Sequence, residues 1–255
     1  MSEQNGAVNL SIEHNIGTIE FYHPKGNSLP GAILRKLANT ITEAGENNEI
    51  HVIVIKSRGE GAFCAGASFD ELIAIEDYDT GKNFFMGFAL VLNAMRTCPK
   101  LIIVRVHGKT VGGGVGIASA GDYTFAHENA SVKLSELALG IGPFVVGPAV
   151  ERKVGTSAFS TMAVDATNWY DSKFAEQKGL FNKVFDSVSD LNQAVRELAT
   201  QLAQSSPEAM RDLKAVLWKG TEDWDLLLEQ RAEISGRLVL SDFTKNFINK
   251  FKSKS

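Results

Sequence analysis

Gly112-Gly113-Gly114-Val115-Gly116 follows an apolar segment, Leu101–Val106, that is typical of a buried strand. Consecutive glycines at the start of a helix cost conformational entropy, so they indicate a backbone that another group must approach closely. The spacing does not match the dinucleotide-binding pattern G-x-G-x-x-G, because Ile117 stands where the last glycine would fall. A nucleophile elbow, G-x-S-x-G, is also absent around Ser119, since residue 117 is not glycine.

A second turn of small residues, Phe63-Cys64-Ala65-Gly66-Ala67-Ser68, comes after another apolar segment, His51–Lys56. Small side chains let a ligand approach the backbone, and a free N–H group at a helix start is a ready donor. A close-packed structural turn explains the same composition. Two such turns in one chain favour a pair of N–H donors aimed at one oxygen, an oxyanion hole. This device suits thioester chemistry, in which an enolate oxygen must be stabilised.

One carboxylate stands among apolar residues. Glu136 has Leu134, Leu137, Leu139 and Ile141 as neighbours in the sequence. An apolar wall around a carboxyl raises its pKa by desolvation and suits it to proton transfer. The alternative is a helix N-cap or a solvated turn residue, and the sequence leaves both open.

The arrangement of apolar segments predicts an α/β fold. Val8–Glu13 and Gly17–Tyr22 read as a hairpin around residues 14–16, and Pro30 begins a helix. Strand, glycine turn and helix then repeat, which predicts parallel strands joined by crossover helices. Short strands are expected at Tyr123–Ala126 and Val132–Leu134. From about residue 156 onward the pattern predicts helices alone, with apolar stripes that pack on the core or on another subunit.

The composition limits the class of protein. The chain has 255 residues, 44% apolar and 22% charged, and a formal net charge of -4, so neither disorder nor a nucleic-acid partner is expected. The longest uncharged apolar run, Phe84–Leu92, is too short to span a membrane, and no signal peptide is recognisable at the N-terminus. Cys64 and Cys98 form no disulfide framework. A cytoplasmic enzyme without metal is therefore expected.

Taken together, four motifs resemble those of the enoyl-CoA hydratase/isomerase (crotonase) superfamily. The turn at residues 63–68 resembles F-x-A-G-A-D, and the glycine stretch lies within His107-Gly108 to Ala120-Gly121-Asp122, which resembles the second family motif. The other two are Ser135-Glu136 with Leu139-Gly140, which resembles P-E-x-x-L-G, and His23-Pro24 with Asn27-Ser28-Leu29, which resembles R-P-x-x-x-N-A-L. The segment Gly142–Pro148 is similar to one found in bacterial methylglutaconyl-CoA hydratase-like members.

This resemblance implies a crotonase fold, a spiral of β-β-α units over residues 1–200 followed by a helical oligomerisation region over residues 201–255. It implies an acyl-CoA substrate, no separate cofactor, and a homotrimer or dimer of trimers. The backbone N–H groups of Ala67 and Gly113 would form the oxyanion hole, and Glu136 would be the acid–base residue. Family positions also imply a substrate-binding and CoA-binding set, which consists of Lys25, Phe63, Ala65, Gly66, Ala67, Ser68, Gly112, Gly113 and Phe144.

Three positions depart from the family pattern. Ser68 replaces the usual Asp, Gly116 stands where two-glutamate hydratases keep their first Glu, and Phe144 stands where dienoyl-CoA isomerases keep an Asp. Hydration of a 2-enoyl-CoA by Glu136 is the first expectation, because the segment at residues 142–148 resembles that of hydratases. The alternatives are a Δ3,Δ2-enoyl-CoA isomerase that uses Glu136 alone and a non-catalytic acyl-CoA-binding or scaffold protein.

Overall fold

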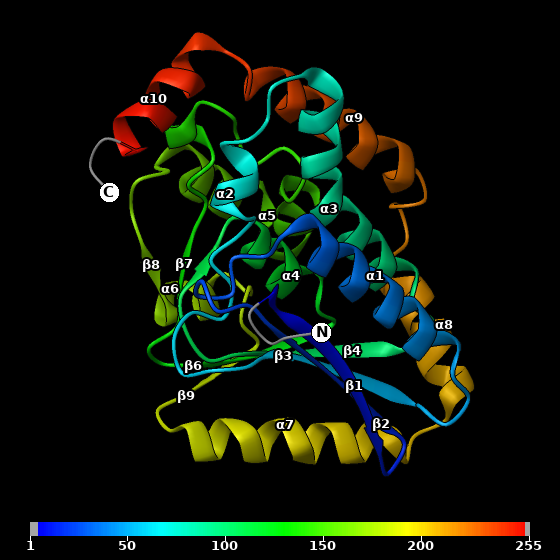
Figure 1. Cartoon of the computed structure of the whole chain (residues 1–255). Coiled ribbons are helices and arrows are strands. Elements are labelled where there is room, and N and C mark those ends of the chain that lie inside the picture. Colours follow the sequence, from blue (N-terminus) through cyan, green and yellow to red (C-terminus); the bar gives the residue numbers. More distant parts are fainter. Residues whose placement is uncertain (1–4, 253–255) are drawn as a thin grey trace.

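The computed structural model describes residues 5–252, which form a central sheet flanked by helices (Figure 1). In this part of the chain the large sheet has six strands in the order β1-β2-β3-β4-β6-β9. β1 and β2 are antiparallel, and every other neighbouring pair is parallel. A smaller sheet has the order β5-β7-β8. The strands are β1 (Ala7–Glu13), β2 (Ile16–Tyr22), β3 (Val52–Ser57), β4 (Leu101–Val106), β5 (Thr110–Val111), β6 (Tyr123–His127), β7 (Ser131–Lys133), β8 (Tyr170–Asp171) and β9 (Lys183–Phe185).

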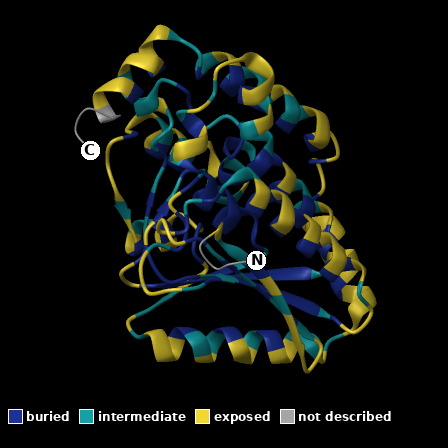
Figure 2. Cartoon of the chain, in the orientation of Figure 1, coloured by how far each residue is buried: buried dark blue, intermediate teal, exposed yellow. Residues whose placement is uncertain are grey.

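Helices cover both faces of the large sheet. The main core lies on the face that carries α1, α3, α4 and α5, while α7 crosses the opposite face (Figure 1). α7 buries Leu191, Val195 and Ala199 against the sheet and leaves its outer side exposed (Figure 2). The helices are α1 (Gly31–Glu46), α2 (Phe69–Leu72), α3 (Tyr78–Thr97), α4 (Gly113–Ala120), η2 (Leu137–Leu139), α5 (Gly147–Val164), α6 (Ser172–Gln177), α7 (Val188–Ala203), α8 (Pro207–Leu217), α9 (Trp224–Leu238) and α10 (Asp242–Lys252).

The predicted hairpin and crossover units are present. His14 and Asn15 both have positive φ, 50° and 61°, so a two-residue turn joins β1 to β2 with the twist that hairpins favour. Ile16, which the sequence placed in the turn, is instead the first residue of β2 and pairs with Glu13. β3 and β4 follow the predicted apolar segments closely.

The expectation of helices alone after residue 156 is wrong. β8 pairs antiparallel with β7, and β9 extends the large sheet by pairing parallel with β6. These strands have two and three residues, too few to show the alternation of a strand in the sequence. Their backbone partners lie far away in the chain, so only the tertiary fold defines them.

The C-terminal helices pack on the core of the same chain. Trp224, Leu228 and Ala232 of α9 are buried in the main core, where Trp224 meets Trp218 edge to face at 5.8 Å between ring centroids. α9 crosses α3 at two glycines: a Cβ atom at Gly81 would lie 2.9 Å from the carbonyl oxygen of Gly236. α10 lies against η2 at the end of the molecule that carries α9 (Figure 1). A role of these helices in oligomerisation stays a prediction.

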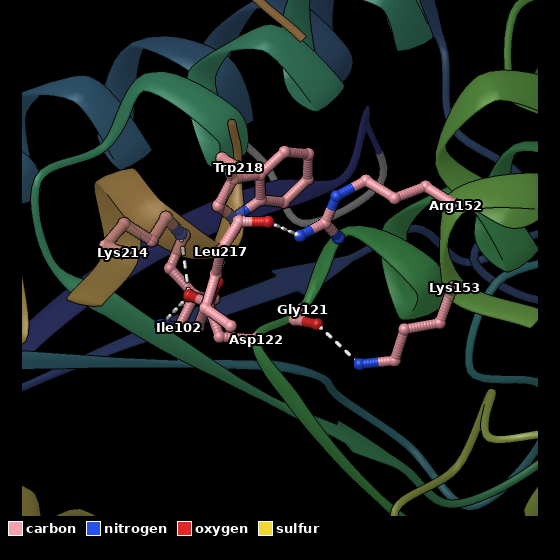
Figure 3. Close-up of polar contacts among 8 residues, drawn as sticks. All are labelled: Ile102, Gly121, Asp122, Arg152, Lys153, Lys214, Leu217 and Trp218. Carbon is pink, nitrogen blue, oxygen red and sulfur yellow. Dashed lines mark hydrogen bonds and ion pairs between the residues drawn. The ribbon is translucent and has the colours of Figure 1, made fainter. Parts of the chain in front are cut away.

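A buried ion pair fixes the C-terminal end of α4. Asp122 accepts hydrogen bonds from Lys214 Nζ at 2.6 Å, Trp218 Nε1 at 2.9 Å and the backbone N–H of Ile102 at 2.7 Å (Figure 3). The Lys214 and Asp122 side chains are only 3% and 7% exposed. Lys153 Nζ donates to the carbonyl of Gly121 at 2.9 Å, so α4, β4, α5 and α8 meet at this one cluster.

Lys214→Met should therefore destabilise the protein strongly. Removing one partner of a buried pair leaves the other charge without compensation, which typically costs about 3–5 kcal/mol. The matched control is Arg211→Met in the same helix, because Arg211 is mainly exposed where it meets Glu208 and Asp212. Exposed pairs contribute less than about 1 kcal/mol. Urea denaturation of both variants measures the difference, and equal losses would contradict the importance of the Asp122 pair.

Candidate active site

A cavity of about 490 Å³ lies where the two glycine turns meet, a volume typical of small-molecule sites. The two turns, the loop that carries Glu136, the helices α2 and α3, and the C-terminal helices all contribute to its wall. The lining residues are Ser28, Ala65, Gly66, Ala67, Phe69, Leu72, Phe84, Phe85, Phe88, Val111, Gly112, Gly113, Ser135, Glu136, Leu139, Ile141, Gly142, Pro143, Val145, Val146, Ser235 and Phe247.

Backbone hydrogen bonds bring the two turns together. The N–H of Cys64 donates to the carbonyl of Lys109 at 3.3 Å, and the N–H of Val111 donates to the carbonyl of Cys64 at 2.9 Å. The loop thus runs beside β5, whose next residue is Gly112. Gly66 has a φ of 89°, which glycine adopts without strain. Ala67 and Gly113, far apart in the sequence, therefore line the same cavity.

Two backbone donors at this point are unengaged. Among the hydrogen bonds of the described residues, the N–H groups of Ala67 and Gly113 have no acceptor. Gly113 is the first residue of α4, where N–H groups lack helical partners and carry the positive end of the helix dipole. The geometry can therefore stabilise negative charge on an oxygen in the cavity. It agrees with the expected oxyanion hole, which stays a prediction.

Each glycine of residues 112–116 is covered by a different side chain. A Cβ atom at Gly112 would lie 2.9 Å from Oε1 of Glu136, and one at Gly113 would lie 2.1 Å from Cζ of Phe88. At Gly114 it would meet Cβ of Cys64 at 2.7 Å, and at Gly116 it would meet Cγ1 of Val146 at 2.8 Å. Gly112 also has a φ of 51°. These contacts leave no room for a side chain at any of these four glycines.

Glu136 holds its carboxylate inside the cavity wall. The residue is partly exposed as a whole, but its Oε2 is covered and has no hydrogen-bond partner in the described part of the chain. Burial raises its pKa to about 7. Glu136 precedes η2 without making a side-chain cap, so the N-cap alternative of the sequence analysis is wrong, and its role in proton transfer stays a prediction. Of the expected apolar neighbours, Leu139 and Ile141 line the cavity, whereas Leu137 points to solvent because η2 turns it outward.

Four of the expected binding residues lie outside the cavity lining. Phe63 is fully buried against Phe21 in the core, and Phe144 packs over Gly142. Ser68 caps α2 by accepting from the N–H of Glu71 at 3.3 Å, so it serves the local role that the usual Asp could fill. Lys25 is exposed and pairs with Asp70. Of the expected set, Ala65, Gly66, Ala67, Gly112 and Gly113 do line the cavity.

Much of the lining carries no local signal in the sequence. Phe84, Phe85 and Phe88 come from α3, and the sequence did not distinguish them from ordinary core residues. Val145 and Val146 precede α5, and Ser235 and Phe247 come from α9 and α10. Helical periodicity shows which face of a helix is apolar, but not whether that face meets the core or a cavity.

Metal and membrane features are absent where the structure can be assessed. Within residues 5–252, no three or more His, Cys, Asp and Glu side chains lie together so that they could hold a metal ion. None of the helices in this range is long and apolar enough to cross a membrane.

The comparison with known families decides the relationship. Residues 11–249 match the family model described as enoyl-CoA hydratase/isomerase. The chain belongs to this family of enzymes. A probable enoyl-CoA hydratase of Bacillus subtilis is 26% identical over 251 residues, which cover 97% of this chain and 96% of that protein. Human mitochondrial methylglutaconyl-CoA hydratase is 28% identical over 86% of this chain and 63% of its own.

Solved structures support the same crotonase fold. An enoyl-CoA hydratase from Bacillus halodurans superposes with a TM-score of 0.88 at 20% identity, covering 95% of this chain and 99% of that one. An enoyl-CoA hydratase/isomerase from Xanthobacter autotrophicus gives a TM-score of 0.86 at 19% identity, covering 96% and 93%. The predicted α/β spiral fold is thereby confirmed.

The raised pKa of Glu136 has a consequence for stability. In the native state the Glu136 carboxyl keeps its proton up to about pH 7, whereas in the unfolded chain it loses the proton near pH 4.5. Between these values the native state binds one more proton, so rising pH should reduce the unfolding free energy by about 1.4 kcal/mol per pH unit. Glu136→Gln removes this contribution. Urea denaturation at pH 5 and pH 7 should show the variant gaining stability relative to the wild type, and a pH-independent difference would refute the assigned burial.

Proposed function

We propose that the enzyme adds water to a 2-enoyl-CoA thioester. The observation that carries the proposal is the Glu136 carboxylate, whose Oε2 is covered and unpartnered in the described structure and whose pKa is raised to about 7, in one cavity with the unengaged N–H groups of Ala67 and Gly113. An acid–base group works best when its pKa lies near the working pH. Donors at a helix start suit the oxygen on which charge develops. The names of several relatives as enoyl-CoA hydratases support the same reaction.

The chemistry follows from the positions of these groups. Water oxygen bonds to the β-carbon as Glu136 takes a water proton, and the π electrons of the double bond move towards the thioester oxygen. The N–H groups of Ala67 and Gly113 stabilise the resulting enolate. The enolate then collapses, and the α-carbon takes the proton from Glu136. The CoA portion would leave the cavity along Ala65 and Gly66 towards Lys25 at the surface, where Lys25 would exchange Asp70 for a phosphate.

Isomerisation of a Δ3-enoyl-CoA is the second candidate, and the packing of Gly116 favours it. Val146 fills the space into which a side chain at residue 116 would extend. Glu136 is therefore the one carboxylate among the described residues that line the cavity. A single base can move one proton between the two carbons that flank a shifting double bond, whereas water generally needs two or more polar partners.

Glu136→Gln should separate catalysis from binding. The substitution keeps the size of the side chain and removes the base, so we expect kcat to fall by about 10²–10⁴-fold while the Kd for acyl-CoA stays nearly constant. Glu128→Gln, at an exposed position, is the control. Mass spectrometry of the product distinguishes the reactions, since hydration adds one water and isomerisation leaves the mass unchanged. Turnover within about threefold of the wild type would exclude Glu136 as the base.

We also propose a homotrimer or dimer of trimers. Apolar side chains remain exposed on the C-terminal helices, with Val216 71%, Leu226 60% and Phe243 65% exposed. Such surface suits contact with another subunit. Light scattering at micromolar concentration should give the mass of three or six chains, and a monomer would contradict the proposal. The buried free thiols Cys64 and Cys98 support a cytoplasmic location.

A further inference from the structure

Two apolar side chains cover two glycines of α4, one helical turn apart, beside the cavity. Phe88 of α3 covers Gly113, with Cζ 2.1 Å from the Cβ position of that glycine. Val146 covers Gly116, one helical turn further along, with Cγ1 2.8 Å from the corresponding point. Both residues also line the cavity, as Gly113 does. We refer to Phe88 and Val146 together as the apolar partition.

The partition is held rigidly. Phe88 is 6% exposed and Val146 is 4% exposed, and both belong to the main core. Val146 directly precedes α5 with helical dihedral angles, φ -84° and ψ -20°, and packs against Gly116 of α4. Its apolar side chain joins α5 to α4 and, because Val146 also lines the cavity, forms a fixed part of the cavity wall.

The described lining of the cavity carries no cationic side chain. The lining contains no Lys, Arg or His among the described residues, and its one ionisable side chain is Glu136. Lys82, on the same helix as Phe88, is bound at 2.7 and 2.8 Å by Glu229 and Glu233 of α9. A carboxylate at the end of an acyl group would thus lose its water, find no cation in the described lining and meet the carboxyl of Glu136.

We propose that Phe88 and Val146 are specificity-determining residues that restrict this enzyme to acyl groups without a charge. The inference rests on the proposed function, because it places the acyl group of a CoA thioester in this cavity. It predicts that this enzyme acts poorly on a glutaconyl thioester, although residues 142–148 resemble those of methylglutaconyl-CoA hydratases. Fold and motifs are shared with that relative, whereas acyl selectivity depends on the wall of this cavity.

A matched pair of substrates tests the selectivity. 2-Pentenoyl-CoA and glutaconyl-CoA both have five acyl carbons and differ in a terminal methyl group against a terminal carboxylate. We expect kcat/KM for the pentenoyl ester to be about 30-fold higher or more in the wild type, since an unpaired charge is costly to bury. A smaller ratio would overturn the inference and leave the proposed function intact. If no 2-enoyl-CoA is turned over, the proposed function fails and the inference fails with it.

Two variants test the residues. Val146→Thr keeps the shape and adds a hydroxyl group that can donate to a carboxylate, so the ratio of the two esters should narrow at least threefold, with a moderate loss of thermal stability because the hydroxyl is buried. Phe88→Leu keeps the wall apolar, so the ratio should stay within about threefold of the wild-type value. Leu90→Ala is the control, because Leu90 lies on the same helix and is 40% exposed. If Phe88→Leu fails to fold, the comparison of Val146→Thr with Leu90→Ala decides. An unchanged ratio in folded Val146→Thr, or a narrowed ratio in folded Phe88→Leu, would overturn the assignment.

Discussion

The close packing of side chains onto the first two turns of α4 is the constraint on which this structure depends. Glu136, Phe88, Cys64 and Val146 arrive from four different segments, and each occupies the space that a Cβ atom would fill on this helix. Any larger residue would push one of these groups away. The same contacts place a carboxylate and an apolar wall next to an unengaged N–H group. The glycines are therefore required by packing and by the chemistry of the cavity together.

The other end of α4 is fixed by charge rather than by close contact. Asp122 accepts hydrogen bonds from Lys214, Trp218 and the N–H of Ile102 (Figure 3). Lys153 donates to the carbonyl of Gly121, the residue that follows α4. Cations near a helix C-terminus are favourable, and removing one partner of a buried pair is strongly destabilising. α4 therefore has a polar cluster at its C-terminal end and the cavity at its N-terminal end.

The electrostatic character of the cavity follows from what it lacks. Glu136 has neither a cation nor a hydrogen-bond partner for Oε2 in the described structure, so desolvation dominates and its pKa rises towards neutrality. A second carboxylate, at residue 116, would need the space that Val146 occupies. The single carboxylate and the apolar wall of the cavity therefore both follow from the packing of Val146 on Gly116. The proposed reaction and the proposed acyl selectivity share this one structural cause.

The sequence by itself determined the parallel crossover units and the two glycine turns, because these depend on local apolar periodicity and on residue types with few structural alternatives. It also singled out Glu136 as a candidate, but left its environment open. Only the tertiary structure decided the rest. β8 and β9 exist through pairing with distant strands. Phe63 and Phe88 both belong to the main core, but only Phe88 also lines the cavity. Val146 gained its place beside Gly116 through the packing of α5 on α4. Such contacts join residues far apart in the chain, and no local pattern encodes which of them will meet.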